Sequence, residues 1–129
     1  MDLNYLAILA GGILYMIYGT IYYSIMLSDK KEHHNKAILD QQSEGPFKYI
    51  YSVVIAFINS FLVAVLVQAT GAETWTDGLM VGLIIGVLIT LVYFKNSLFG
   101  LMSRRVFFIA IGEHLVIFTL LGILHGIMA

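Results

Sequence analysis

Three ionisable side chains lie within an otherwise apolar stretch near the end of the sequence. Glu113 and His114 are adjacent, and His125 follows further along the same stretch. Ionisable residues inside a membrane span are candidates for function, because a charge at the centre of a span costs about 2.5–3.5 kcal/mol on insertion scales. One interpretation is a titratable site on a proton-linked or ion-linked path. The other is that His114 donates a hydrogen bond that fixes the helix bundle, while Glu113 is neutral or reaches a water pocket.

Further polar residues are predicted to lie at the depth of this pair. Neighbouring residues on a helix project about 100° apart, so Glu113 and His114 are expected to have separate partners. Asn59 is near the middle of an apolar segment, where it either holds helices together or coordinates a substrate or ion beside the last helix. The candidate polar site comprises His114, Glu113, Asn59, Thr90 and Tyr23, and the other hydroxyl groups expected near it are those of Thr20, Ser24 and Ser52. His125 is expected at the outer membrane interface.

Catalytic and metal-binding patterns are absent from the sequence. It has no cysteine, and neither H-E-x-x-H nor G-x-S-x-G occurs. His33 and His34 are adjacent, but adjacent histidines do not share a helix face, so their segment is interpreted as a solvated loop. We therefore expect no enzyme activity, no metal and no cofactor. The net charge of -1 gives no indication of a nucleic-acid partner.

The composition is that of a membrane protein. Hydrophobic residues make up 60% of the chain, charged residues 12%, and the mean hydropathy is +0.90, whereas about a quarter of the residues in soluble domains are charged. Four segments have the length of about 20 apolar residues that a spanning helix needs, at 4–27, 49–69, 75–94 and 106–128. The sequence predicts an all-α polytopic protein, with a single four-helix transmembrane domain over residues 1–129 that forms a compact bundle in the lipid bilayer. The first segment lacks a basic leading region and a cleavage site, so we expect it to be retained.

The basic residues predict the orientation of the spans. Lys and Arg accumulate in short cytoplasmic loops, and all seven basic residues fall in two connections, at Lys30, Lys31, Lys36, Lys48, Lys95, Arg104 and Arg105. The loop 28–48 is therefore expected in the cytoplasm, with a short interfacial helix within 30–42, and both termini are expected outside. We predict a multi-pass protein of the bacterial cytoplasmic membrane.

Regularly spaced small residues predict where the helices pack. Lipid is as apolar as leucine, so helices associate in membranes through close contacts between small residues and through polar contacts. The predicted packing glycines are Gly12, Gly19, Gly78, Gly82, Gly86, Gly112 and Gly126. On the last span, the stripe with Gly112 and Gly126 lies nearly opposite the stripe with His114 and His125. The last span should be covered on at least two sides, by a central position in the bundle or by a second subunit, and we predict a homo-oligomer, most simply a dimer.

Two short patterns resemble those of a known family. Gly19, Tyr22, Tyr23 and Ser24 resemble a first-span pattern G-x-x-W-Y-S-P, with tyrosine in place of tryptophan and Ile25 in place of proline. Gly112, His114 and Leu115 resemble a last-span pattern G-Y-H-L, in which Glu113 replaces the tyrosine. The chain thus resembles the uncharacterised small bacterial four-span membrane proteins called domain of unknown function 1761. This resemblance implies a four-span fold over nearly the whole chain and brings no established activity.

Two functions are compatible with these features. The first is a small oligomeric transporter or channel-like protein for an ion or small solute, with a buried ionisable site on the fourth helix. Small multidrug exporters are also short four-span proteins, but they use a carboxylate in the first span, and here that span has no acidic residue after Asp2. The second is a non-catalytic accessory or regulatory subunit that uses its glycine-rich faces to bind itself or an unidentified membrane partner.

Overall fold

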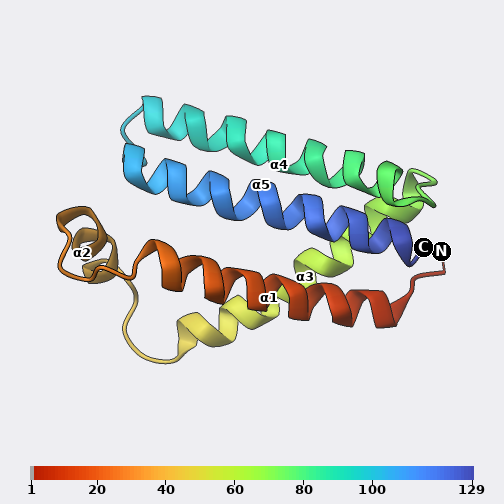
Figure 1. The fold of residues 1–129 in the computed structure, drawn as a ribbon, viewed down its shortest axis with the longest axis horizontal. Coiled ribbons are helices and arrows are strands. Elements are labelled where there is room, and N and C mark those ends of the chain that lie inside the picture. Colours follow the sequence, from red (N-terminus) through yellow and green to blue (C-terminus); the bar gives the residue numbers. More distant parts are fainter. Residues whose placement is uncertain (1) are drawn as a thin grey trace.

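The computed structural model describes residues 2–129, and this part of the chain is helical, without strands (Figure 1). Four long helices are apolar enough to span a membrane, which confirms the predicted fold class. A short fifth helix lies in the first connection. The helices are α1 (Tyr5–Met26), α2 (His33–Asp40), α3 (Phe47–Ala69), α4 (Trp75–Leu98) and α5 (Arg104–Ile127).

Polar caps determine where three of the long helices begin. Asn4, Thr74 and Ser103 each accept a hydrogen bond from a backbone N–H in the first turn of α1, α4 and α5. α4 continues to Leu98, beyond the apolar segment 75–94, because the polar residues after 94 still permit a helix. Gly100 follows with φ of 78°, a left-handed conformation that often ends helices.

α5 lies at the centre of the arrangement. It packs against α4 along most of its length and also contacts α1 and α3 (Figure 1). The apolar core contains Val63 and Val67 of α3 together with Ile117, Phe118 and Leu121 of α5. A central α5 covered by helices of its own chain explains why polar side chains are accommodated on more than one of its faces.

The contact between α4 and α5 depends on glycine. Cβ atoms added at Gly78 and Gly82 would overlap the carbonyl oxygens of Gly122 and Phe118 in α5. A Cβ at Gly86 would lie 2.7 Å from the Leu115 side chain. The two backbones therefore approach as closely as small residues allow in membrane helix pairs.

Three other glycines of the predicted packing set, Gly12, Gly112 and Gly126, also make close contacts with neighbouring helices. Gly126 meets the Thr74 carbonyl at the start of α4, whereas Gly112 meets Tyr22 of α1. Gly12 meets the ring of Phe57 in α3. Gly112 and Gly126, which were predicted on one stripe of α5, thus contact two different helices. This agrees with the drift of about 20° per seven residues in a straight α-helix.

Hydrogen bonds between polar side chains join α2 to the start of α5. The Arg105 Nη2 group donates to Asn35 Oδ1 at 3.1 Å and lies 3.3 Å from the Met26 carbonyl oxygen. Asn35 is only 3% exposed, and its Nδ2 donates to the Asp29 carbonyl at 3.0 Å. Glu32 caps α2, and hydrogen bonds from the His34 side chain and from backbone N–H groups lower the pKa of Glu32 to about 2.

Replacing Asn35 by alanine should loosen α2 without unfolding the four spans. The substitution leaves Arg105 with one hydrogen bond fewer in a half-buried position, a loss of about 1–3 kcal/mol. Hydrogen exchange of the α2 amides should accelerate roughly tenfold or more. Lys36→Ala on the exposed side of α2 is the matched control. Equal exchange in both variants would show that the hydrogen bonds of Asn35 do not hold α2 in place.

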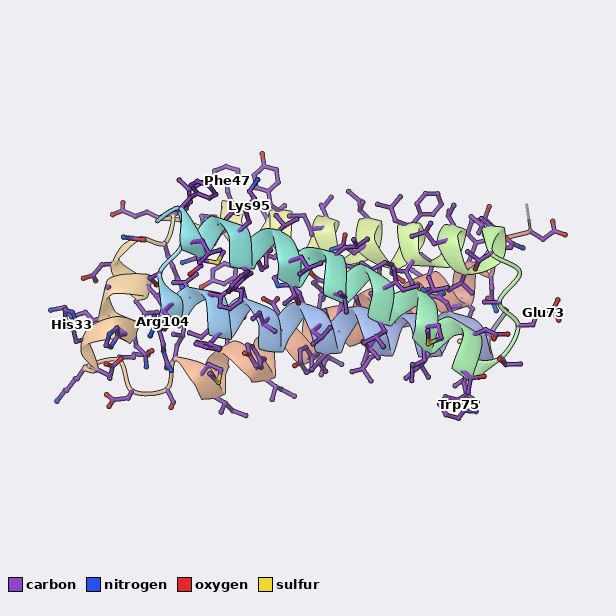
Figure 2. The ribbon with its side chains drawn as sticks, turned by 90° about the horizontal axis from the view of Figure 1, so that it is seen from above. His33, Phe47, Glu73, Trp75, Lys95 and Arg104 are labelled. Carbon is purple, nitrogen blue, oxygen red and sulfur yellow. The ribbon has the colours of Figure 1, made fainter. Side chains whose placement is uncertain are left out.

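Charges are separated between the two ends of the bundle. Lys95 and Arg104 lie at the end that carries α2, whereas Glu73 and Trp75 lie at the opposite end (Figure 2). Both termini lie at the same end as the start of α4, which follows Glu73 (Figure 1). The fold thus has one end with all the basic residues and another whose charged side chains are acidic among residues 2–129.

Candidate functional site between α1 and α5

The carboxyl group of Glu113 lies in the contact between α5 and α1. Glu113 is 7% exposed, and its Oε2 accepts a hydrogen bond from the Tyr23 hydroxyl. A Cβ at Gly19 would lie 3.9 Å from Glu113 Oε1, so the glycine leaves ordinary van der Waals space beside the carboxyl group. The site is a single carboxyl group held by a phenol from a neighbouring helix.

Two more tyrosines of α1 bind the backbone of α5 next to Glu113. The Tyr18 hydroxyl donates to the Gly112 carbonyl at 2.8 Å, and the Tyr22 hydroxyl donates to the Ile109 carbonyl at 2.7 Å. Their rings stack with centroids 5.7 Å apart, because residues four apart lie on the same face of a helix. A carbonyl oxygen has two lone pairs and accepts such a bond in addition to its helical one.

The absence of a side chain at Gly112 makes room for the Tyr22 hydroxyl. A Cβ at Gly112 would overlap that oxygen and lie 3.0 Å from Tyr22 Cζ. The glycine of the last-span pattern and the tyrosines of the first-span pattern are therefore parts of one contact.

This contact predicts a rescue between two substitutions. Gly112→Ala should destabilise the protein by about 1–3 kcal/mol, the usual effect of overpacking. Tyr22→Phe removes the overlapping oxygen, so the double variant should regain part of that loss. Unfolding in mixed detergent micelles measures the coupling between the two positions. Strictly additive losses would show that the hydroxyl does not occupy the space above Gly112.

His114 binds within its own helix. Its Nδ1 lies 2.8 Å from the Ala110 carbonyl oxygen, which only accepts hydrogen bonds, so Nδ1 carries a proton. In the neutral ring Nε2 is then the acceptor. The same Nδ1 is 3.7 Å from Glu113 Oε2, beyond hydrogen-bond distance, and the ring meets Tyr93 of α4 edge to face. Glu113 and His114 thus have different principal partners.

The structure brings only part of the predicted polar set together. Of the expected hydroxyl groups, that of Tyr23 binds Glu113, whereas Thr90 and Ser52 donate to the carbonyls of Gly86 and Lys48 in their own helices. Asn59 is half-buried on α3, and its side chain has no hydrogen bond to Glu113 or His114. Tyr18 and Tyr22 were not in the predicted set, although their four-residue spacing is a signal for a shared face.

A second buried polar contact lies towards the other end of α5. Ser60 of α3 is fully buried, and its hydroxyl donates to the Ile8 carbonyl at 2.8 Å. His125 Nε2 lies 3.1 Å from the same Ser60 oxygen. Because the hydroxyl has one proton and donates it to Ile8, Nε2 must be the donor to Ser60. Nδ1 is therefore the acceptor nitrogen of the neutral ring.

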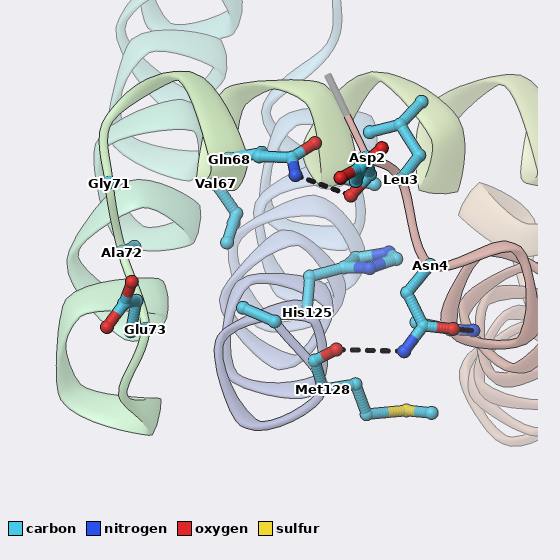
Figure 3. A pocket seen from close by; sticks show the side chains of 13 residues that line it. Asp2, Leu3, Asn4, Val67, Gln68, Gly71, Ala72, Glu73, His125 and Met128 are labelled. Carbon is cyan, nitrogen blue, oxygen red and sulfur yellow. Dashed lines mark hydrogen bonds between the residues drawn. The ribbon is translucent and has the colours of Figure 1, made fainter.

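His125 lies in the last turn of α5, and its side chain is buried among the helices. Its side chain is 3% exposed and points into the bundle, because α1 and α3 enclose α5 as far as its last turn. His125 also lines a cavity of about 140 Å³ between the ends of α1, α3 and α5 (Figure 3). This cavity is not lined by Glu113 or His114.

The fold and this contact define a polytopic helical membrane protein whose first and last spans join through tyrosine hydroxyls and a buried carboxyl group. The model of the protein family of unknown function DUF1761 matches residues 6–126. The chain therefore belongs to the DUF1761 family, as the two short patterns indicated. No curated protein and no solved structure matches it.

Proposed function

We propose that this protein is a small proton-linked transporter in which Glu113 takes up and releases a proton during the transport cycle. The observation that carries the proposal is the contact of the buried Glu113 carboxyl group with the Tyr23 hydroxyl. Among residues 2–129, Glu113 is the acidic residue that lies inside a span and away from the ends of that span. Its one ion-pair contact among these residues is with His114, whose Nδ1 lies 3.7 Å from Glu113 Oε2. Buried charges without close cationic partners are expensive, so uptake of a proton would relieve that cost.

The surrounding residues support a change of protonation at this point. The ionised carboxylate accepts the Tyr23 hydrogen bond, whereas the neutral acid has a proton of its own to donate. Gly19 leaves space for about a methyl group beside Glu113 Oε1, since a Cβ there would lie 3.9 Å away. Protonation would thus change the bonding between α1 and α5, which is the kind of change that couples a proton to helix movement.

The orientation and assembly are part of the same proposal. The basic end would face the cytoplasm of a bacterial cell, with both termini outside. We retain the dimer as its simplest assembly, and a second copy would meet a lipid-facing surface such as Phe47, Ile50 and Ile55 of α3, which are exposed. Cross-linking in native membranes should give a dimer, and a monomer alone would contradict this part.

An accessory subunit has less support. That function was expected to use the glycine-rich faces, but Gly78 and Gly82 pack on α5 of the same chain and are not free for another protein. Its remaining contact surface would be the lipid-facing side chains. The vesicle experiment below also separates the two functions, because an accessory subunit has no proton flux of its own.

Proton flux in reconstituted vesicles tests the transporter. Vesicles that contain the purified chain and a pH-sensitive dye receive a pH gradient in the presence of Na⁺, K⁺ or NH₄⁺. The wild type should dissipate the gradient faster than protein-free vesicles with at least one of these cations, and Glu113→Gln should return to the protein-free rate. Glu44→Gln, in the exposed loop, is the matched control. Wild-type flux in Glu113→Gln, or no flux in any condition, would overturn the proposal.

A further inference from the structure

The cavity beside His125 has a mostly apolar lining that also carries several polar side chains, which the Glu113 site does not explain. It lies at the end of the bundle opposite the basic residues, and its lining contains Asp2 and Glu73 but no lysine or arginine (Figure 3). Its volume of about 140 Å³ is close to that of an engineered apolar cavity of about 150 Å³ that holds benzene. It therefore has room for a ligand of a few non-hydrogen atoms.

His125 supplies an acceptor on the wall of this cavity. The Ser60 hydroxyl fixes the imidazole proton on Nε2, as shown above, so Nδ1 has a free lone pair in the neutral ring. Nδ1 has no hydrogen bond to residues 2–129, and it is not among their fully enclosed unpaired polar atoms. A side chain that is 3% exposed thus has an unpaired acceptor that the cavity leaves accessible.

The backbone at the wall of the cavity also favours a positively charged ligand. Val67 and Gln68 belong to the last turn of α3, and Met128 is the C-cap of α5. Helix C-termini carry partial negative charge and attract cations. The side chain of Asn4, at the N-terminus of α1, already has its hydrogen-bond partners. Its Oδ1 accepts from the Ala7 N–H, and its Nδ2 donates to the Met128 carbonyl. The lining thus includes the C-termini of α3 and α5 and the N-terminus of α1, whose cap is in place, while Glu73 precedes the Thr74 cap of α4.

We propose that this cavity binds a small organic cation of the primary-ammonium class, one of whose N–H groups donates to His125 Nδ1 and whose charge is balanced by Asp2 and Glu73. The site is separate from Glu113, since the core residues Ile117, Phe118 and Leu121 lie between the two positions on α5. It goes beyond the proton-linked function and does not depend on it.

Calorimetric titration of the full chain in detergent, at one fixed pH, tests the site with two probes of equal size. Isopropylammonium should bind with one site per chain and roughly tenfold or more tighter than isopropanol. The variant Asp2→Asn with Glu73→Gln changes two exposed residues and should fold normally while it weakens ammonium binding roughly tenfold. Asp77→Asn changes a carboxylate at the same end that does not line the cavity, and should leave binding unchanged.

A second variant tests the histidine. Ser60→Ala removes the acceptor that keeps the proton on Nε2, so Nδ1 becomes a donor in part of the molecules and ammonium binding should weaken about threefold or more. Circular dichroism confirms that the variants are folded. The proposal is overturned if isopropanol binds as tightly as isopropylammonium, if the carboxylate variant binds like the wild type, or if the wild type takes up no ammonium.

Discussion

Replacing Gly82 by alanine is expected to destabilise the protein by about 3 kcal/mol or more, at the upper end of what overpacking causes. The added Cβ would overlap the Phe118 carbonyl oxygen and lie 2.9 Å from Thr119 Cα. Both are backbone atoms, so no side-chain rotation relieves the contact, and α4 must move away from α5. Unfolding of the reconstituted or micellar protein measures the loss.

Gly19→Ala is the matched control for this prediction. Both glycines lie inside long helices, so alanine should gain the same helix propensity of about 0.8–1 kcal/mol at each. At Gly19 the new Cβ would meet only Glu113 Oε1, at 3.9 Å. Gly19→Ala should therefore be neutral or stabilising. A Gly82→Ala protein as stable as the wild type would show that α4 and α5 are not packed this closely.

Replacing Tyr23 by phenylalanine should reduce the proton flux in vesicles roughly tenfold or more. A hydrogen bond to a charged group contributes about 1.5–3 kcal/mol, and about 1.4 kcal/mol corresponds to a tenfold change in rate. Folding should be retained, because interhelical hydrogen bonds in a membrane protein average about 0.6 kcal/mol of stability. The comparison of flux with stability distinguishes a role in proton transfer from a purely structural one.

Tyr51→Phe is the control for Tyr23→Phe. Tyr51 is 65% exposed on α3, and its hydroxyl has no hydrogen bond to residues 2–129. Its flux should match that of the wild type. Equal flux from the Tyr23→Phe and Tyr51→Phe proteins would exclude the Tyr23 hydroxyl from the path of the proton.

The helices could be predicted from the sequence because their signals are local. Hydropathy identifies four spans, and Asn4, Thr74 and Ser103 mark the starts of three of them through bonds to their own first turns. The segment predicted at 75–94 stops before Lys95, Asn96 and Ser97, which are polar but remain helical in the last turn of α4. Polarity marks where the membrane interface is reached and does not by itself stop a helix.

The contacts between helices could be predicted only in part. The spacing of Gly78, Gly82 and Gly86 indicates a packing face, but the partner of that face depends on how four helices are arranged. Gly122, which meets Gly78, was missed for the same reason. The bond between Ser60 and His125 joins residues 65 apart in the chain, and no local pattern specifies such a distance.

Infrared spectra of the wild-type protein in lipid bilayers test the central claim that Glu113 exchanges a proton. The difference between spectra at low and high pH should contain the carbonyl band of a protonated carboxyl group inside the protein. That band should be lost in Glu113→Gln, and Tyr23→Phe should change its frequency because the hydrogen bond to the carboxyl group is removed. A difference spectrum that is the same in wild type and Glu113→Gln would contradict the account.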